Sequence, residues 1–182
     1  MTRPVAIYGG SFDPPHVAHT LVCAYVLAAH EVERVLVVPT RRHPFDKPLA
    51  PFEHRLRMCE LAFADLRRVE ISDIERELPE PSLTLRTLQA LQASMPGASL
   101  RLVIGSDVLR ETARWHEFDA VAALAPPLVI ARAGYPAPDG GPPLPEVSST
   151  EIRQRLRDGL ATEGLLSSAV AAHAAEHGLY RT

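Results

Sequence analysis

The sequence has few of the features that mark secreted, membrane-bound or nucleic-acid-binding proteins. Only two of its 182 residues are cysteines, Cys23 and Cys59, and both lie in apolar segments, which indicates reduced core thiols rather than a disulfide framework. No segment approaches the roughly 20 apolar residues that a membrane-spanning helix needs, and the N-terminus has no signal-peptide pattern. We therefore expect a cytoplasmic protein without membrane attachment.

An excess of positive charge is also absent. The formal net charge is -3, so the chain has no overall field that would attract DNA or RNA. With 46% hydrophobic and 23% charged residues, the composition is that of an ordinary folded protein, and the length suits one domain with a full core. We expect a single domain over residues 1–182, no nucleic-acid partner and small-molecule ligands; the residues carry no signal for an oligomeric state.

Strand-like and helix-like segments alternate along the chain. Short apolar runs predict strands at 4–8, 34–38, 67–71, 100–104 and 128–131. Apolar residues at helical spacing predict helices at 17–30, 52–64 and 82–94. This alternation favours an α/β fold of the Rossmann-like, doubly wound type, with a mostly parallel sheet and helices on both faces.

The last third of the chain begins with an irregular segment. Residues 133–145 contain five prolines and three glycines, which predicts a surface loop without regular structure. Two C-terminal helices are expected beyond it, at 149–157 and 165–177, packed on the sheet or over its edge.

The densest group of chemically active residues follows the first predicted strand. It reads Gly9-Gly10-Ser11-Phe12-Asp13-Pro14-Pro15-His16-Val17-Ala18-His19. In an open parallel sheet, ligands bind at the carboxyl ends of strands, where a helix N-terminus offers N–H groups to phosphate. We expect the two glycines to form a turn that lets the backbone approach the ligand closely.

His16 and His19 lie three residues apart at the start of the following helix. Both can donate to phosphate oxygens and so offset the charge that develops when a phosphoanhydride breaks. Such a pair is more often a surface coincidence or half of a metal site, but no third ligand lies nearby in the sequence and the glycine turn supplies a context for anions.

A second candidate anion site opens the helix at 149–157. It reads Val147-Ser148-Ser149-Thr150-Glu151-Ile152-Arg153. Hydroxyl groups at a helix start usually serve as caps. Here Ser149, Thr150 and Arg153 share the first turn, so hydroxyls, free N–H groups and a guanidinium can converge on a triphosphate.

These two segments resemble the GG(T/S)FDPxHxGH and (I/V)SSTxIR motifs of the nucleotidylyltransferase superfamily. The resemblance covers nearly the whole chain, because Gly178-Leu179-Tyr180 also matches the usual ending of that family. Ala18 stands where the usual motif has glycine, a position expected beside the adenine or ribose, and we expect its methyl group to be tolerated. The resemblance implies that ATP is bound by Gly9, Gly10, Ser11, Phe12, His16, Ala18, His19, Ser149, Thr150 and Arg153.

Two further segments indicate the identity of the second substrate, which accepts the adenylyl group. Residues 81–88 resemble the SYTxDTL segment of nicotinate-nucleotide adenylyltransferases, and Ile104-Gly105-Ser106-Asp107 with Trp115 resembles their IGxD…W pattern, a pair not expected in pantetheine-phosphate adenylyltransferases. Trp115 can stack on a pyridine ring, Thr84 can donate to a carboxylate and Asp107 can accept from ribose hydroxyls. The residues expected to bind nicotinate mononucleotide are Lys47, Thr84, Gly105, Asp107, Trp115 and Arg132.

Two positions in the acceptor half depart from the family pattern, and two arginines have only a general signal for phosphate binding. Asp46 stands beside Lys47 where the relatives usually have histidine, and Arg86 replaces an aspartate in the SYTxDTL segment. Arg55 and Arg132 are further candidates to meet phosphate, although solvated arginines are commoner than ligating ones.

The resemblance implies transfer of the adenylyl group of ATP to nicotinate mononucleotide, which gives nicotinate adenine dinucleotide and pyrophosphate in NAD biosynthesis. His16, His19, Lys47 and Arg153 would be the catalytic residues, acting electrostatically, and Mg²⁺ would arrive with ATP. One alternative is the same chemistry with nicotinamide mononucleotide or phosphopantetheine as acceptor. The other is a nucleotide-sensing module that binds ATP without turnover.

Overall fold

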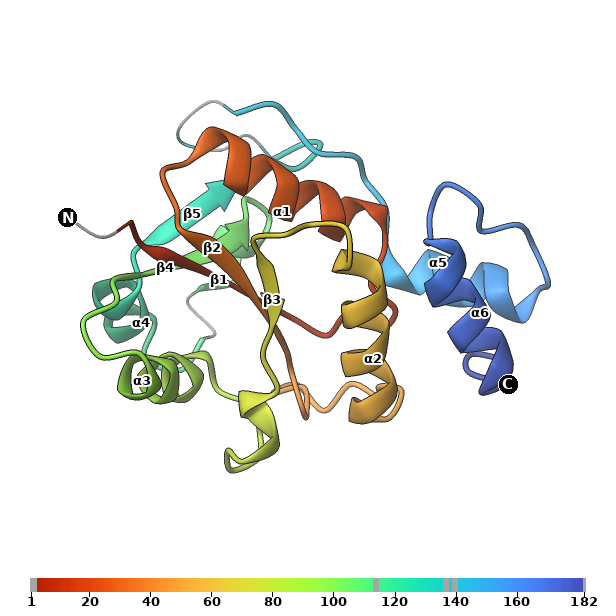
Figure 1. The fold of residues 1–182 in the computed structure, drawn as a ribbon, viewed down its shortest axis with the longest axis horizontal. Helices are drawn as coiled ribbons and strands as arrows, with labels where there is room; N and C mark the ends of the chain where they lie inside the picture. Colours follow the sequence, from red (N-terminus) through yellow and green to blue (C-terminus); the bar gives the residue numbers. More distant parts are fainter. Residues whose placement is uncertain (1–2, 113–114, 136–137, 139–140, 182) are drawn as a thin grey trace.

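The computed structural model describes residues 3–112, 115–135, 138 and 141–181, and its centre is one parallel sheet (Figure 1). The strand order is β3-β2-β1-β4-β5, and every neighbouring pair in it is parallel. Chain order therefore reverses beside β1, with β2 and β3 on one side and β4 and β5 on the other. The strands are β1 Val5–Gly10, β2 Arg34–Pro39, β3 Val69–Ile71, β4 Leu100–Gly105 and β5 Pro127–Ile130.

Helices cover both faces of the sheet because successive strand residues point to opposite sides. Ala6 and Tyr8 of β1 face a core shared with α1 (Val17–Ala29) and α2 (Phe52–Phe63). Val5 and Ile7 face a second core, to which α3 (Thr84–Ser94) and α4 (Phe118–Leu124) contribute. The α/β fold predicted from the alternation of elements is confirmed.

The two C-terminal helices were expected on the sheet or over its edge, and this expectation is wrong. α5 (Ser149–Arg157) and α6 (Ser168–Glu176) pack with α2 instead, on the side of the molecule away from α3 and α4 (Figure 1). The reason is a third apolar core, formed by Met58, Ile152, Leu166 and Val170. α2 thus has one side toward the sheet and another toward the C-terminal helices.

Capping side chains set where these helices begin. The Ser148 hydroxyl accepts a hydrogen bond from the Glu151 N–H at 3.1 Å, so α5 begins at Ser149 as predicted. The Ser167 hydroxyl accepts from the Val170 N–H at 3.3 Å, so α6 begins at Ser168, three residues later than predicted. Within the described part of the chain, no helix combines the length and apolar character needed to cross a bilayer.

The proline-rich segment 133–145 lies only partly within the described residues. Its described part is tied to the end of β5, because the Leu144 N–H donates to the Ala131 carbonyl at 3.0 Å. Arg132 and Tyr135 exchange two backbone hydrogen bonds, of 3.1 and 2.8 Å. These bonds hold Arg132 beside the carboxyl end of β4.

Candidate active site

A cavity of about 560 Å³ opens beside the carboxyl ends of β1 and β4. This is the point where strand order reverses, which is where open α/β sheets bind their ligands, and the volume is that of a small-molecule site. The cavity brings residues of both predicted substrate halves together. The predicted site residues on its wall are Gly9, Gly10, Ser11, Phe12, His19, Thr84, Gly105, Trp115 and Arg132.

Gly9 and Gly10 do not form the predicted turn, because both lie inside β1 and pair with Val38 and Pro39 of β2. The left-handed backbone falls on Phe12 instead, at φ 48°. A Cβ atom on Gly10 would lie 3.1 Å from the Phe12 ring, whereas one on Gly9 would meet no atom within 4 Å. Gly10 therefore makes room for Phe12, and Gly9 leaves open space at the cavity wall.

The ring of Phe12 packs against His19 of the histidine pair. It is fully buried and meets the ring of His19 edge-on, with 4.9 Å between ring centroids. The rings of His16 and His19 stack at 3.7 Å, and the backbone N–H of His16 donates to Nδ1 of His19 at 3.1 Å. Because Nδ1 of His19 accepts, the proton of this neutral ring is on Nε2, which is then the donor for a ligand.

Both histidines are neutral at pH 7. Burial, followed by the charge of Arg132, lowers the pKa of His16 to about 4. Burial lowers the pKa of His19 well below its ordinary value, and His16 and then Arg132 lower it further. The pair therefore offers hydrogen bonds rather than positive charge, and positive charge must come from neighbouring arginine and lysine residues or from protonation when an anion binds.

The second predicted motif, on α5, docks against the loop that follows β1. The Ser149 hydroxyl donates to the Pro14 carbonyl at 3.0 Å, and Nη1 of Arg153 donates to the Asp13 carbonyl at 2.6 Å. Nη2 of Arg153 donates to the hydroxyl of Thr150 at 3.2 Å. The two motifs thus meet through Asp13 and Pro14, which follow Ser11 and Phe12 of the cavity wall and precede His16 by two to three residues.

Asp13 is the buried centre of this junction, and no prediction assigned it a role. The residue is 2% exposed, and its carboxylate accepts hydrogen bonds from the Tyr180 hydroxyl at 2.6 Å and from the Ala50 N–H at 3.3 Å. Arg153 approaches the same carboxylate at 3.8 Å. The Asp within the first motif and the Tyr at the chain end were visible in the sequence, but nothing there indicated that they touch.

Arg55, which the sequence offers as a phosphate ligand or a solvated residue, has neither role in the structure. It is 1% exposed and donates to three backbone carbonyls, at 2.8 Å to Ser11, 2.8 Å to Ala50 and 3.1 Å to Arg41. Its guanidinium therefore joins the loops that follow β1 and β2. The only sequence signal was an arginine on the apolar face of a predicted helix.

Gly105, Asp107 and Arg132 form one group at the end of β4. Nε of Arg132 lies 3.8 Å from Oδ1 of Asp107. A Cβ atom on Gly105 would come within 2.3 Å of that oxygen and 3.3 Å of that nitrogen, so the pair requires glycine here. The Ser106 hydroxyl, which sequence reasoning passed over, accepts from the Arg132 N–H at 2.9 Å and donates to the Tyr135 carbonyl.

Thr84 and Trp115 also line the cavity. Thr84 is the first residue of α3, where backbone N–H groups lack partners within the helix. Trp115 meets Phe118 edge-on at 5.8 Å. The cavity wall also holds a buried pair that the sequence did not reveal, in which the Thr87 hydroxyl donates to the Glu75 carboxylate.

Seven predicted site residues lie apart from the cavity wall, as far as the described residues define it: His16, Ala18, Lys47, Asp107, Ser149, Thr150 and Arg153. Lys47 lies in a neighbouring groove of about 460 Å³, which shares His43 with the main cavity. Ala18 is 3% exposed and packs inside the protein. The expected contact of its methyl group with adenine or ribose therefore has no counterpart in the cavity lining.

Asp46 and Arg86, the two charged residues that depart from the family pattern, both have partners close by in the sequence. Asp46 accepts from Nη2 of Arg42 at 3.0 Å on the surface. Arg86 donates to the carbonyls of Pro79 and Pro81, at 2.7 and 3.3 Å, and so fixes the turn before α3. Neither residue lines the cavity among those described, which explains how the chain accommodates both changes.

The fold and the site together define the class of enzyme to which the chain belongs. Residues 7–155 match the cytidylyltransferase-like family model, and with this cavity and its two motifs the chain is a nucleotidyltransferase. The probable nicotinate-nucleotide adenylyltransferase of Anaeromyxobacter sp. (strain K) is 47% identical to it, over 98% of this chain and 97% of the relative. The corresponding protein of Myxococcus xanthus is 44% identical, over 97% and 94%. The chain belongs to the nicotinate-nucleotide adenylyltransferase family.

Solved structures agree on the fold. The Plasmodium falciparum nicotinic acid mononucleotide adenylyltransferase complexed with NaAD superposes with a TM-score of 0.83 at 21% sequence identity. The match covers 98% of this chain and 97% of that one. The Rossmann-like architecture is thus shared at low sequence identity.

Proposed function

We propose that this protein transfers the adenylyl group of ATP to nicotinate mononucleotide, giving nicotinate adenine dinucleotide and pyrophosphate, as a step of NAD biosynthesis. One observation carries the proposal. The two phosphate-binding motifs meet at Asp13 and Pro14, beside a cavity that also collects Thr84, Trp115 and Arg132. Its family membership supports the same activity.

The chemistry requires positioning and charge stabilisation rather than a general base. A phosphate oxygen of the mononucleotide, already anionic, forms a bond to the α-phosphorus of ATP, and the bond from that phosphorus to the bridging oxygen breaks. The β- and γ-phosphates leave as pyrophosphate. In this scheme Nε2 of His19 donates to the reacting phosphate, while Arg132 and Arg153 supply positive charge. ATP enters as its Mg²⁺ complex, because Mg²⁺ usually binds through substrate phosphates.

We assign the two substrate halves to different residues. The open space at Gly9 is assigned to the nucleotide, and the triphosphate is assigned to Ser149, Thr150 and Arg153, whose helix docks on the loop before His16. In the acceptor half, Trp115 provides a ring surface for the pyridine. Thr84 and the N-terminus of α3 offer donors to its carboxylate, a group that nicotinate has and nicotinamide lacks. Lys47 is proposed for the acceptor phosphate, since His43 of the same segment already lines the cavity.

The acceptor is tested by parallel assays of pyrophosphate release with nicotinate mononucleotide, nicotinamide mononucleotide and phosphopantetheine. We expect kcat/KM for nicotinate mononucleotide to exceed the other two by at least about tenfold, which is ~1.4 kcal/mol of discrimination. A preference for either of the others would overturn the acceptor assignment. ATP binding without pyrophosphate release under all three would favour the nucleotide-sensing alternative.

The role of the histidine pair is tested by His19→Ala. We expect kcat to fall by roughly 10²- to 10³-fold, as for the loss of one preorganised donor to a transition state, with an unchanged far-ultraviolet circular dichroism spectrum. His30→Ala is the matched control, since His30 follows the other end of α1. Near-normal turnover by the His19 variant would refute its role.

We also propose that the protein acts in the cytoplasm on small-molecule nucleotides and not on nucleic acids. Its two cysteines are buried and unpaired, and burial raises the pKa of the Cys23 thiol to about 12. Such thiols are unreactive core residues of the kind that a reducing compartment preserves.

A further inference from the structure

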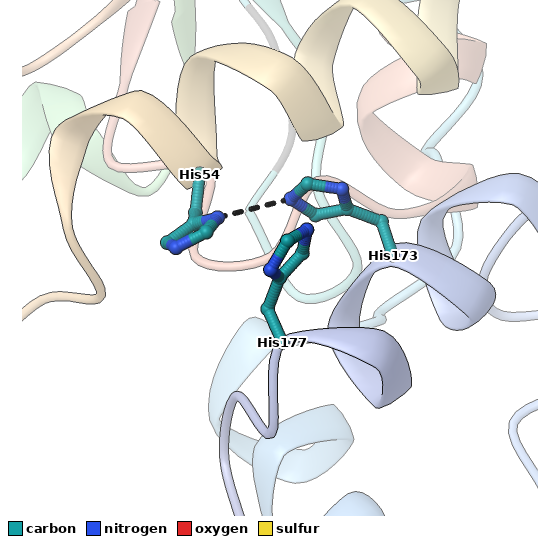
Figure 2. A group of neighbouring side chains, drawn as sticks. All are labelled: His54, His173 and His177. Atoms are coloured by element: carbon teal, nitrogen blue, oxygen red, sulfur yellow. Dashed lines mark hydrogen bonds between the residues drawn. The ribbon is translucent and has the colours of Figure 1, made fainter.

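Three histidines outside the two phosphate-binding motifs converge between α2 and the end of α6 (Figure 2). His54 lies in the first turn of α2, His173 in the last turn of α6, and His177 directly after α6. One ring nitrogen from each residue lies within 4.8 Å of the other two. Nδ1 of His54 and Nε2 of His173 are 3.2 Å apart.

The rings are arranged so that nitrogen atoms, rather than ring faces, approach one another. The three pairs have interplanar angles of 42 to 58° and centroid distances of 4.5 to 5.3 Å, unlike the stacked rings of His16 and His19. His173 and His177 are four residues apart, so both project from the same side of the chain toward His54, as Figure 2 shows.

These distances fit coordination of a single ion. Two nitrogens at 2.0–2.1 Å from a tetrahedral Zn²⁺ are about 3.3 Å apart, close to the separation of His54 and His173. His177 is the exposed member of the group, so a small change of its rotamer meets little steric resistance. Its exposure also leaves the remaining coordination position open to water.

We propose that His54, His173 and His177 bind one divalent transition-metal ion of the Zn²⁺ type, which clamps α6 to α2. Imidazole nitrogens suit such ions, whereas Mg²⁺ prefers oxygen ligands, so this site is separate from the metal carried by ATP. Tyr180, three residues beyond His177, donates to the buried Asp13. The ion would therefore hold the C-terminal segment that contacts the loop before His16.

The test uses the full chain without an affinity tag, treated with chelator and titrated with ZnCl₂ or MgCl₂ by calorimetry in the absence of nucleotide. We expect one Zn²⁺ per chain and no Mg²⁺ binding. At a free Zn²⁺ concentration 100-fold above Kd, the Tm should rise by roughly 5 to 10 °C.

Substitutions then locate the ion. His54→Ala, His173→Ala and His177→Ala should each weaken Zn²⁺ binding by at least about tenfold, because the loss of even an outer-shell partner typically costs roughly 10- to 100-fold. His30→Ala is the matched control. His19→Ala should also keep full affinity, which separates this site from the histidine pair of the cavity.

Absence of Zn²⁺ binding, or binding that survives His177→Ala, would overturn the proposal. His177 is the exposed residue of the three, so its variant is the one whose folding is least at risk, and circular dichroism checks it. Because no nucleotide is present, the result is independent of the proposed adenylyl transfer.

Discussion

The hydroxyl group of Tyr180 donates a hydrogen bond of 2.6 Å to Oδ1 of Asp13, joining residues 167 positions apart. Burial and the Asp13 carboxylate raise the pKa of Tyr180, so the hydroxyl keeps its proton and remains a donor. The backbone carbonyl of Asp13 accepts from Arg153. The end of the chain, the start of α5 and the loop before His16 are therefore one hydrogen-bonded unit.

Tyr180→Phe should loosen this unit without removing any apolar contact. The buried carboxylate loses a donor, so we expect the free energy of unfolding to fall by about 1–3 kcal/mol and the KM for ATP to rise. Urea unfolding and steady-state kinetics measure the two effects. Tyr25→Phe, in α1, is the control and should change neither. Wild-type stability and KM in the Tyr180 variant would show that the hydrogen bond has no such role.

Arg55→Lys tests whether geometry or charge matters at the junction of the two loops. Lysine keeps the positive charge but cannot place donors on three carbonyls at once, so we expect a loss of at least about 2 kcal/mol of unfolding free energy. Arg57→Lys, two residues along α2 and paired with Glu60 on the surface, should stay within about 0.5 kcal/mol of wild type. Equal effects of the two changes would contradict the clamp described for Arg55.

Gly9→Ala separates ligand contact from folding. A Cβ atom there meets nothing in the protein without ligand, so the Tm should remain within about 1 °C of wild type, a change well below that expected for 1 kcal/mol. If the nucleotide occupies that space, its KM should rise by at least about tenfold, or ~1.4 kcal/mol. Thermal unfolding measures the Tm, and steady-state kinetics at varied ATP concentration measure the KM. An unchanged KM would show that the nucleotide binds elsewhere.

Unlike Gly9→Ala, Gly105→Ala should disturb the protein even when no ligand is bound. Its Cβ would overlap Oδ1 of Asp107 at 2.3 Å and crowd Arg132, so this pair must move even without substrate. We expect kcat/KM to fall by at least about tenfold while the helical content stays unchanged. Circular dichroism and kinetics check this, and full activity would argue against a role for the pair.

The burial of His16 predicts a pH dependence of stability. Its pKa is near 6.5 in the unfolded chain and about 4 in the folded protein, so between these values the unfolded state binds more protons. Stability is therefore fully present above pH 6.5 and is lost as the pH falls toward 4, by roughly 3 kcal/mol for this shift. His16→Gln should flatten that part of the curve in urea unfolding from pH 4 to 8. If the plots of unfolding free energy against pH were parallel for the wild type and the variant, His16 would not be the group responsible for the pH dependence.

The sequence predicted the α/β architecture and most elements within a few residues. The bounds of α5 were correct because a local signal, the Ser148 cap, sets its start. The turn at Gly9 and Gly10 was wrong because glycine permits unusual dihedrals without requiring them, and here the Phe12 ring requires the missing Cβ of Gly10. The start of α6 was placed too early because Leu165 and Leu166 have the apolar pattern of a helix, although Ser167 caps the helix after them.

What the sequence alone determined are the features encoded by neighbouring residues. These are the strand and helix periods, the two phosphate-binding motifs and their order along the chain, and the residues that resemble the acceptor half of the family. Their physical basis is local, since a side-chain period or a cap depends on residues a few positions apart.

Which distant groups meet depends on tertiary packing, and no local pattern encodes it. Tertiary packing joined Tyr180 to Asp13, placed Arg55 between two loops and brought His54 to His173 and His177. It also set the charge state of His16 and His19, because a pKa depends on burial and on neighbours such as Arg132. Packing of α5 and α6 on α2 brings the C-terminal residues to Asp13 and His54, and the apolar pattern of a helix specifies a buried face but not the partner that covers it.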